Sequence, residues 1–401
     1  MKTRSDPVLT VRPARRARIA AHHIGDLREK ARRRLPKLVF DYVEGGSFDE
    51  VTMRANESDL AAVRLRQRGM VDISTRSMRT TIAGLPAAMP VALAPLGLAG
   101  IVAAHGEIHA ARAAEAFGVP YCLSTLSACS IADVAAAVTT PFMFQLYIFK
   151  DRGVNEALVA RAREAGCGAL IVTMDAHVRG RRHRETKSGM QMPMRLSPRV
   201  AFDCARHPAW LWRWFTSRRK SLGNIAAFVG GAADMEACAA WVEANYRGTY
   251  DQREFEWLRG HWPGKLIVKG LLDEEEAELA VELGADAIVV SNHGGRQLDS
   301  AQSSARAMPA IRDRVGGRVE LIFDGGIRSG VDILKALGLG ATSCFIGRSY
   351  IYGLAAGGEA GVRTALGLLA EELDTAMALT GVNDVTRLPP RLVVEGGGRP
   401  A

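Results

Sequence analysis

Residues 287–293 read Ala-Ile-Val-Val-Ser-Asn-His, and this stretch decides the fold. Its four apolar residues form an uninterrupted run, which is typical of a parallel strand buried on both faces. The run ends in Ser291, Asn292 and His293, which can form hydrogen bonds and, in the case of His293, accept a proton. A buried strand that finishes in such groups is typical of a parallel α/β protein whose chemistry lies at the carboxyl ends of its strands.

Seven further runs share this design. Each is short and apolar, and most are followed by a stretch rich in Ala, Leu and Glu that has helical character. The eight runs are residues 89–94, 120–124, 142–147, 169–175, 265–270, 287–293, 320–325 and 343–347. Eight strands that alternate with helices predict an α/β fold, the (β/α)₈ TIM barrel.

The regular spacing breaks once, between the fourth and fifth strands. We therefore expect a long insertion at residues 176–264 within a barrel that spans residues 35–385. Residues 1–34 form a basic N-terminal extension, expected to be partly disordered, and residues 386–401 form a C-terminal tail.

The composition is that of a globular protein, with 48% hydrophobic and 24% charged residues. The N-terminal 34 residues hold eleven Lys and Arg against three Asp and Glu, and so carry most of the net charge of +9. The nearly neutral remainder argues against a nucleic-acid-binding surface. Six scattered cysteines and the absence of zinc-ligand spacing argue against a disulfide framework and a metal site.

Two stretches bear on membranes. Residues 80–104 are apolar and long enough to span a bilayer, but their three prolines and three glycines predict a loop, a buried strand and a turn instead. Residues 207–220 carry Trp210, Trp212 and Trp214 beside a basic cluster, which is typical of a peripheral membrane contact. A packing or oligomer-contact segment is an equal alternative. With no signal segment, we expect a cytoplasmic protein.

Polar side chains follow the predicted strands at the points where the strands end. They are Gln145, Tyr147, Thr173, Asp175, Lys269, Ser291, His293, Asp324 and Arg348. Gly325, Gly326 and Arg328 follow the seventh strand, and Gly347 precedes Arg348 after the eighth, where this fold usually binds phosphate.

His293 and Arg296 predict the chemistry. A 2-hydroxy acid needs cationic donors for its carboxylate, a base near its Cα–H and O–H, and an electron acceptor on the other side. A lone histidine is more often structural, but His293 shares its rim with further arginines and tyrosines.

The stretch 291–299, Ser-Asn-His-Gly-Gly-Arg-Gln-Leu-Asp, resembles the FMN-dependent α-hydroxy-acid dehydrogenase and oxidase family. The resemblance runs from about residue 35 to about residue 381, with supporting matches at residues 35–46, 144–147 and 266–270 and in both phosphate loops. Within the family the chain looks most like the bacterial quinone-type L-lactate dehydrogenases, and next like the mandelate dehydrogenases. His177, where related lactate enzymes tend to have proline, and Leu126, at a variable pocket position, limit the transfer.

The resemblance implies a role for each site residue. His293 is the base and Asp175 its carboxylate partner, while Arg182 and Arg296 clamp the substrate carboxylate and Tyr42 and Tyr147 contact the substrate. The residues implied to bind FMN are Pro95, Leu96, Gly97, Ser124, Gln145, Thr173, Lys269, Ser291, Asp324, Gly325, Gly326, Arg328, Gly347 and Arg348. Plainer roles stay open for three of these residues: a solvated basic turn for Arg182, a helix cap for Asp175 and a core position for Tyr42.

The implied reaction is FMN-dependent oxidation of a small L-2-hydroxy acid, with L-lactate favoured, to the 2-oxo acid. Electrons pass from FMN to a quinone or another acceptor, and a homotetramer at the cytoplasmic face of the inner membrane is implied. The alternatives are an L-mandelate-type dehydrogenase, an oxidase that uses O₂, an enzyme acting on a larger, peptide-derived hydroxy acid, and a non-catalytic flavin-binding barrel.

Overall fold

Eight parallel strands form the centre of the structure, a computed structural model that describes residues 19–190, 197–217, 219–230 and 233–394. The strands are β4 (Val91–Leu93), β5 (Cys122–Ser124), β6 (Met143–Leu146), β7 (Ala169–Thr173), β8 (Lys265–Leu271), β9 (Ala287–Val290), β10 (Glu320–Asp324) and β11 (Ser343–Ile346). Their order in the sheet is β4-β11-β10-β9-β8-β7-β6-β5. A bridge between Leu93 and Tyr121 joins the two outer strands, so the sheet curls into the expected (β/α)₈ barrel.

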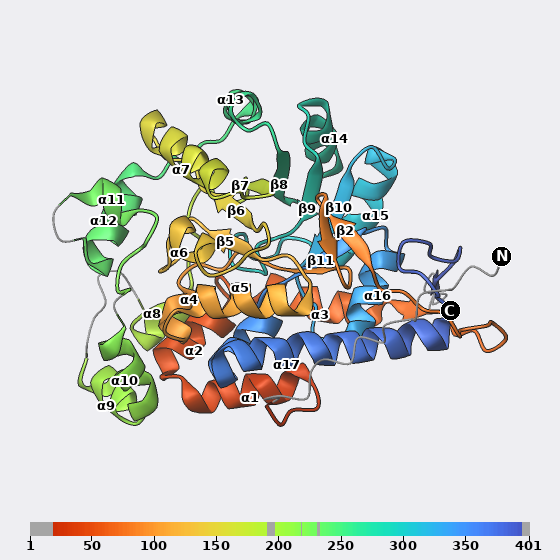
Figure 1. Ribbon diagram of the computed structural model, residues 1–401, viewed down its shortest axis with the longest axis horizontal. Coiled ribbons are helices and arrows are strands. Elements are labelled where there is room, and N and C mark those ends of the chain that lie inside the picture. The colour runs from red at the N-terminus through yellow and green to blue at the C-terminus, as the bar shows by residue number, and fades with distance from the viewer. Residues whose placement is uncertain (1–18, 191–196, 218, 231–232, 395–401) are drawn as a thin grey trace, which may run out of the picture.

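Helices surround this barrel, as the alternating pattern predicted (Figure 1). They include α5 (Gly106–Phe117), α6 (Ile131–Ala135), α7 (Arg152–Glu164), α14 (Glu274–Glu282), α15 (Ser304–Val315), α16 (Gly330–Gly338) and α17 (Arg348–Thr380). Non-helical backbone at Gly357 and Gly358 kinks α17. Before the barrel come α1 (Ile24–Arg34), α2 (Lys37–Glu44) and α3 (Val51–Ala62), and α1 packs alongside α17 through buried Ile24, Leu27 and Ala31.

A small hairpin covers the amino-terminal mouth of the barrel. Strands β2 (Thr80–Ile82) and β3 (Leu85–Ala87) pair antiparallel, and Ile82, Ala83 and Ala87 pack into the apolar barrel interior. This hairpin stands where the sequence predicted a loop, while the predicted buried strand is β4. The short α4 (Ala99–Val102) follows β4. Across the described ranges, no helix is both long and apolar enough to cross a membrane.

The described part of the long connection between β7 and β8 contains six helices: α8 (His183–Ser188), α9 (Pro198–Ala205), α10 (Pro208–Thr216), α11 (Ala226–Val229), α12 (Met235–Asn245) and α13 (Gln252–His261). Figure 1 shows α9 and α10 at one edge of the molecule, beside α1 and α2. Near the other end of the chain, β12 (Val393–Val394) pairs antiparallel with β1 (Arg64–Leu65). Because the insertion follows the carboxyl end of β7, it extends the side of the barrel where the strands end.

Candidate active site

The carboxyl ends of the strands open into a cavity of about 790 Å³. Eighteen of the twenty residues singled out from the sequence line it. They are Tyr42, Pro95, Leu96, Gly97, Ser124, Gln145, Tyr147, Thr173, Arg182, Lys269, His293, Arg296, Asp324, Gly325, Gly326, Arg328, Gly347 and Arg348. The other two, Asp175 and Ser291, lie directly behind the wall, where they hydrogen-bond to His293 and Lys269.

His293 and Asp175 form an ion-pair-type contact at the cavity wall. His293 Nδ1 lies 2.9 Å from Asp175 Oδ1, and the His293 backbone is left-handed, with φ of 60°. Burial alone would raise the pKa of Asp175, but its contact with His293 and the positive charge of Lys269 lower it below its usual value. The ionised carboxylate can only accept a hydrogen bond, so Nδ1 carries the proton and Nε2 keeps its lone pair.

Burial also determines the resting state of His293. It lowers the pKa of the imidazole, and the opposing attraction of Asp175 does not reverse this shift. His293 is therefore neutral near neutral pH, as a general base must be. Once the ring takes a proton, Asp175 stabilises the resulting imidazolium. In this geometry Asp175 bonds to His293 and does not act as a helix cap.

Gly270 makes the contact between His293 and Asp175 sterically feasible. A bulge interrupts the pairing of β8 with β9 between Lys269 and Leu271, and Gly270 has φ of 106°. A Cβ atom at Gly270 would overlap the carboxyl group of Asp175. The glycine thus supplies both the backbone conformation and the space that the carboxylate occupies.

Lys269, Ser291 and Asp324 form a buried polar cluster at the floor of the cavity. Lys269 Nζ lies 2.9 Å from Ser291 Oγ and 3.0 Å from Asp324 Oδ2, and Ser291 Oγ donates to Asp324 Oδ2 at 2.7 Å. Burial alone would lower the pKa of Lys269, but the carboxylates of Asp324 and Asp175 raise it. Lys269 therefore holds a fixed positive charge at the cavity floor, and Asp324 supplies the anionic partner that its burial requires.

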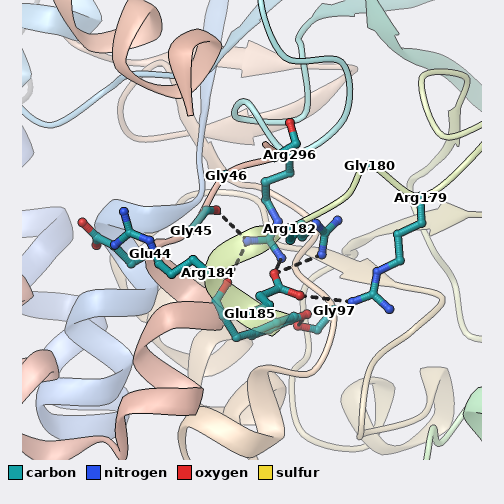
Figure 2. A network of polar contacts seen from close by, with 12 residues as sticks. Glu44, Gly45, Gly46, Gly97, Arg179, Gly180, Arg182, Arg184, Glu185 and Arg296 are labelled. Carbon is teal, nitrogen blue, oxygen red and sulfur yellow. Dashed lines mark hydrogen bonds and ion pairs between the residues drawn. The ribbon is translucent and has the colours of Figure 1, made fainter. Parts of the chain in front are cut away.

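Three arginines converge on one buried glutamate (Figure 2). Glu185, in α8, is 2% exposed and accepts from Arg296 Nη2 at 2.8 Å, Arg182 Nη1 at 3.3 Å and Arg179 Nη2 at 3.1 Å. Burial, with the repulsion of Arg296, lowers the pKa of Arg182 to about 10, so the guanidinium is still charged near neutral pH. The solvated basic turn considered for Arg182 does not describe this residue, whose side chain is only 12% exposed.

Two further features of Arg296 and Arg182 bear on anion binding. Arg296 Nη1 donates to the backbone oxygens of Tyr42 and Gly45, which fixes the orientation of its guanidinium. Arg182 Nε is buried and has no partner in the described part of the chain. The cluster thus brings more positive charge to the cavity than Glu185 neutralises.

Two tyrosines also line the cavity. Tyr42 donates to the backbone oxygen of Gly97 at 3.1 Å, and the Arg296 guanidinium lies 5.0 Å from the centre of its ring. Tyr147 meets Tyr246 edge to face at 5.9 Å, and Tyr246 itself donates to the backbone oxygen of Ala176. Burial raises the pKa of both Tyr42 and Tyr147, so both hydroxyls keep their protons. The Tyr147 hydroxyl can donate to a bound anion, and the Tyr42 hydroxyl can do so once it turns away from Gly97.

The loops after β10 and β11 have the chemistry of a phosphate site. Gly325 and Gly326 have positive φ, and a Cβ at Gly326 would overlap the backbone of Asn56 in α3. Burial lowers the pKa of Arg348 to about 10, and its guanidinium donates to the backbone oxygens of Gly294, Gly45 and Glu44. Within the described ranges it has no ion pair. A buried charge without a counter-ion at the start of α17 fits an incoming phosphate.

Another part of the cavity lining fits the ring of a flavin. Ser124 Oγ donates to Gln145 Oε1 at 3.0 Å, which leaves Gln145 Nε2 buried without a partner in the described residues. Thr173 and residues 95–97 line the same cavity. An orphaned amide donor in the same cavity as the fixed charge of Lys269 suits the carbonyl oxygens and ring nitrogens of an isoalloxazine.

Sequence reasoning did not identify Glu185, Gly270 or Tyr246. Glu185 stands in a run of charged residues, and nothing in that run marks it as buried. Gly270 follows Lys269 in an apolar strand, and a glycine at a strand end was the available signal of a bulge. Tyr246 lies in the long insertion, whose path no local pattern predicts.

Comparison with known proteins finds FMN-dependent dehydrogenases as relatives. The model of the FMN-dependent dehydrogenase family matches residues 31–395. An L-lactate dehydrogenase of Caulobacter vibrioides is 48% identical over 371 residues, covering 92% of this chain and 97% of the relative. An L-lactate dehydrogenase of Pseudomonas aeruginosa is 46% identical over 361 residues, covering 90% of this chain and 94% of the relative.

Solved structures are similar as well. A monotopic membrane protein, (S)-mandelate dehydrogenase, superimposes with a TM-score of 0.89 at 35% identity, covering 94% of this chain and all of its own. A mandelate oxidase superimposes with a TM-score of 0.78 at 36% identity, covering 91% of this chain and 96% of its own. The match extends over nearly the whole chain in each case.

Proposed function

This chain belongs to the FMN-dependent dehydrogenase family, as an FMN-dependent hydroxy-acid oxidoreductase, and from that premise we propose that it oxidises L-lactate to the 2-oxo acid. The observation that carries the proposal is the juxtaposition, in one cavity, of a neutral His293 backed by Asp175 and the arginine pair Arg182 and Arg296. The relatives named L-lactate dehydrogenase favour lactate over mandelate as the substrate.

In the proposed mechanism the arginines orient the substrate. Arg182 and Arg296 bind its carboxylate, while Tyr42 and Tyr147 donate to the carboxylate or the hydroxyl group. This places the reacting carbon near His293, whose Nε2 takes a substrate proton. Asp175 then stabilises the imidazolium through the Nδ1 hydrogen bond.

FMN, when bound, accepts the two electrons of the reaction. The residues that would hold it are Arg348, Arg328 and the glycines of the two loops at the phosphate, and Ser124, Gln145, Thr173 and residues 95–97 along the ring. Lys269, held by Ser291 and Asp324, would place its positive charge near N1 and O2 of the ring and favour negative charge there.

The electron acceptor is proposed to be a quinone. One experiment tests substrate and acceptor together: anaerobic addition of L-lactate, D-lactate or (S)-mandelate to the purified protein, followed by mixing with O₂ or a quinone. We expect L-lactate to bleach the flavin fastest and the quinone to restore its colour. Faster bleaching by (S)-mandelate would favour the mandelate alternative, and rapid reoxidation by O₂ would favour the oxidase.

We also propose that α10 makes a peripheral contact with the cytoplasmic face of the inner membrane. Trp212 and Phe215, on α10, are 72% and 68% exposed, and nearby Phe202 is 68% exposed. The neighbouring basic cluster is only partly available, because Arg219 is bound to Asp133, while Arg218 lies outside the described residues. An exposed aromatic face beside positive charge suits an anionic lipid surface.

The double variant Trp212→Ser/Phe215→Ser should lose sedimentation with anionic vesicles and keep its flavin. Leu279→Ser, an exposed apolar residue on α14, is the matched control and should bind vesicles as the wild type does. Equal sedimentation of both variants would assign α10 to packing or subunit contact. We further propose a homotetramer, which light scattering of the purified protein would test directly.

A further inference from the structure

A second cavity lies behind the first one. It has a volume of about 290 Å³, and α4 separates it from the larger cavity. Val102 lines both cavities, so one turn of a four-residue helix is the wall between them. On the far side of this wall, residues 95–98 line the larger cavity at the proposed position of the flavin ring. Since a helix with its side chains is about 10 Å across, the two cavities are close enough for direct electron transfer.

The floor of the second cavity is apolar and buried. Leu35, Ile101 and Ala103 are each less than 9% exposed. Trp210 donates from Nε1 to the backbone oxygen of Ile101 at 2.7 Å, and it stacks with Trp214 at 5.9 Å. The Trp210 indole is therefore bonded to the helix that forms the shared wall, and Trp214 stacks on it.

The rim of the same cavity is cationic. Arg33 and Arg34 come from the end of α1, Arg206 from the end of α9 and Arg213 from α10. Arg34 donates to the backbone oxygen of Ala356, and none of the four forms an ion pair with a carboxylate in the described ranges. An apolar floor below unpaired guanidinium groups suits a flat apolar ring with oxygens at its edge.

We propose that this cavity binds the quinone that reoxidises the enzyme, an inference that rests on the proposed dehydrogenase function. The ring lies between the floor and Trp214, and the guanidinium groups donate to the quinone oxygens and stabilise the negative charge that develops as electrons arrive. The isoprenoid tail leaves towards the exposed Trp212 and Phe215. Overall, the 2-hydroxy acid loses two electrons and two protons, and the quinone gains two of each to become the quinol.

The experiment uses the full-length, flavin-loaded protein and a benzoquinone with a decyl tail. Two variants alter the cavity: Ala104→Phe fills it, and Arg206→Gln/Arg213→Gln removes half of its rim charge. Arg199→Gln, an exposed arginine on α9 outside the cavity, is the matched control. One readout is quenching of tryptophan fluorescence by the quinone without substrate, and the other is the rate at which quinone reoxidises flavin that has been reduced photochemically.

In both cavity variants we expect the quinone to quench tryptophan fluorescence less. We expect it to reoxidise the reduced flavin at least about tenfold more slowly, because a hydrogen bond to a charged group is lost. The control should behave as the wild type. Unchanged reoxidation in both variants would overturn the proposal. Because the flavin is reduced by light, this test does not depend on lactate being the substrate. Failure of L-lactate to bleach the wild-type flavin would instead count against the proposed function.

Discussion

His293 derives its proposed reactivity from its immediate surroundings. Its left-handed backbone turns the ring to Asp175, and burial keeps the ring neutral. Protonation of His293 at low pH would remove the base, so kcat/KM should fall as the pH drops through its pKa. Because burial lowers that pKa, the rate should stay level from neutral pH into mild acid. A profile of kcat/KM against pH measures this, and a fall that begins above the ordinary histidine pKa would contradict the assignment.

Glu185 should act as a positioning residue for the arginines. Glu185→Gln removes the charge that Arg182, Arg296 and Arg179 share, and breaking a buried ion pair costs about 3–5 kcal/mol. We expect a lower melting temperature and a raised KM for L-lactate, with flavin content retained. Glu185→Asp keeps the charge and should recover part of both losses. An unchanged KM in Glu185→Gln would show that the arginines hold their positions without it.

Single site residues were predictable where they belong to a local sequence motif. The stretch 291–299 and the glycine-arginine loops led to His293, Arg296 and Arg348, all of which line the cavity. Glu185 was not predictable, because its burial depends on α8 folding against α2 across the chain. The anionic partner of Lys269 was not named from the sequence. Asp324, which was assigned to cofactor binding, is the carboxylate that pairs with the lysine.

At the scale of the element, the bulge in β8 links the strand to the chemistry. Gly270→Ala should force Asp175 away from His293, because the new Cβ would overlap the carboxyl group. Gly166→Ala is the matched control: Gly166 also has positive φ, 70°, but nothing lies near its Cβ position. Each variant should lose about 1–2 kcal/mol of stability from backbone strain. In stopped-flow experiments, slower flavin reduction by L-lactate is expected in Gly270→Ala alone, and equal rates in both variants would refute the steric argument.

The barrel strands were predictable because burial on both faces makes each of them a continuous apolar run. The hairpin of β2 and β3 was not, because Pro86 within β3 is unusual in a strand. It is tolerated here, since β3 pairs with β2 alone among the strands described. The insertion was predicted as a long excess of chain, but the positions of the helices described in it follow from tertiary contacts that no local sequence period records.

At the scale of the whole molecule, the cofactor should hold the open end of the barrel together. Arg182 Nε and Gln145 Nε2 are buried without a hydrogen-bond partner in the described structure, and Arg348 is bonded there to backbone oxygens but to no carboxylate. Removing FMN should therefore lower the melting temperature, and added FMN should restore it in a concentration-dependent way. Riboflavin, which lacks the phosphate, is the control and should restore less. Equal melting temperatures with and without FMN would count against the phosphate site.

The central claim is that His293 is the base for oxidation of a 2-hydroxy acid, and the most direct test is flavin reduction in His293→Asn. Asparagine keeps a polar side chain but cannot take the proton. In anaerobic stopped-flow mixing with L-lactate, we predict that the variant keeps its bound FMN and that the rate of bleaching falls by about 10²–10⁴-fold. Bleaching of the variant at the wild-type rate would contradict the account.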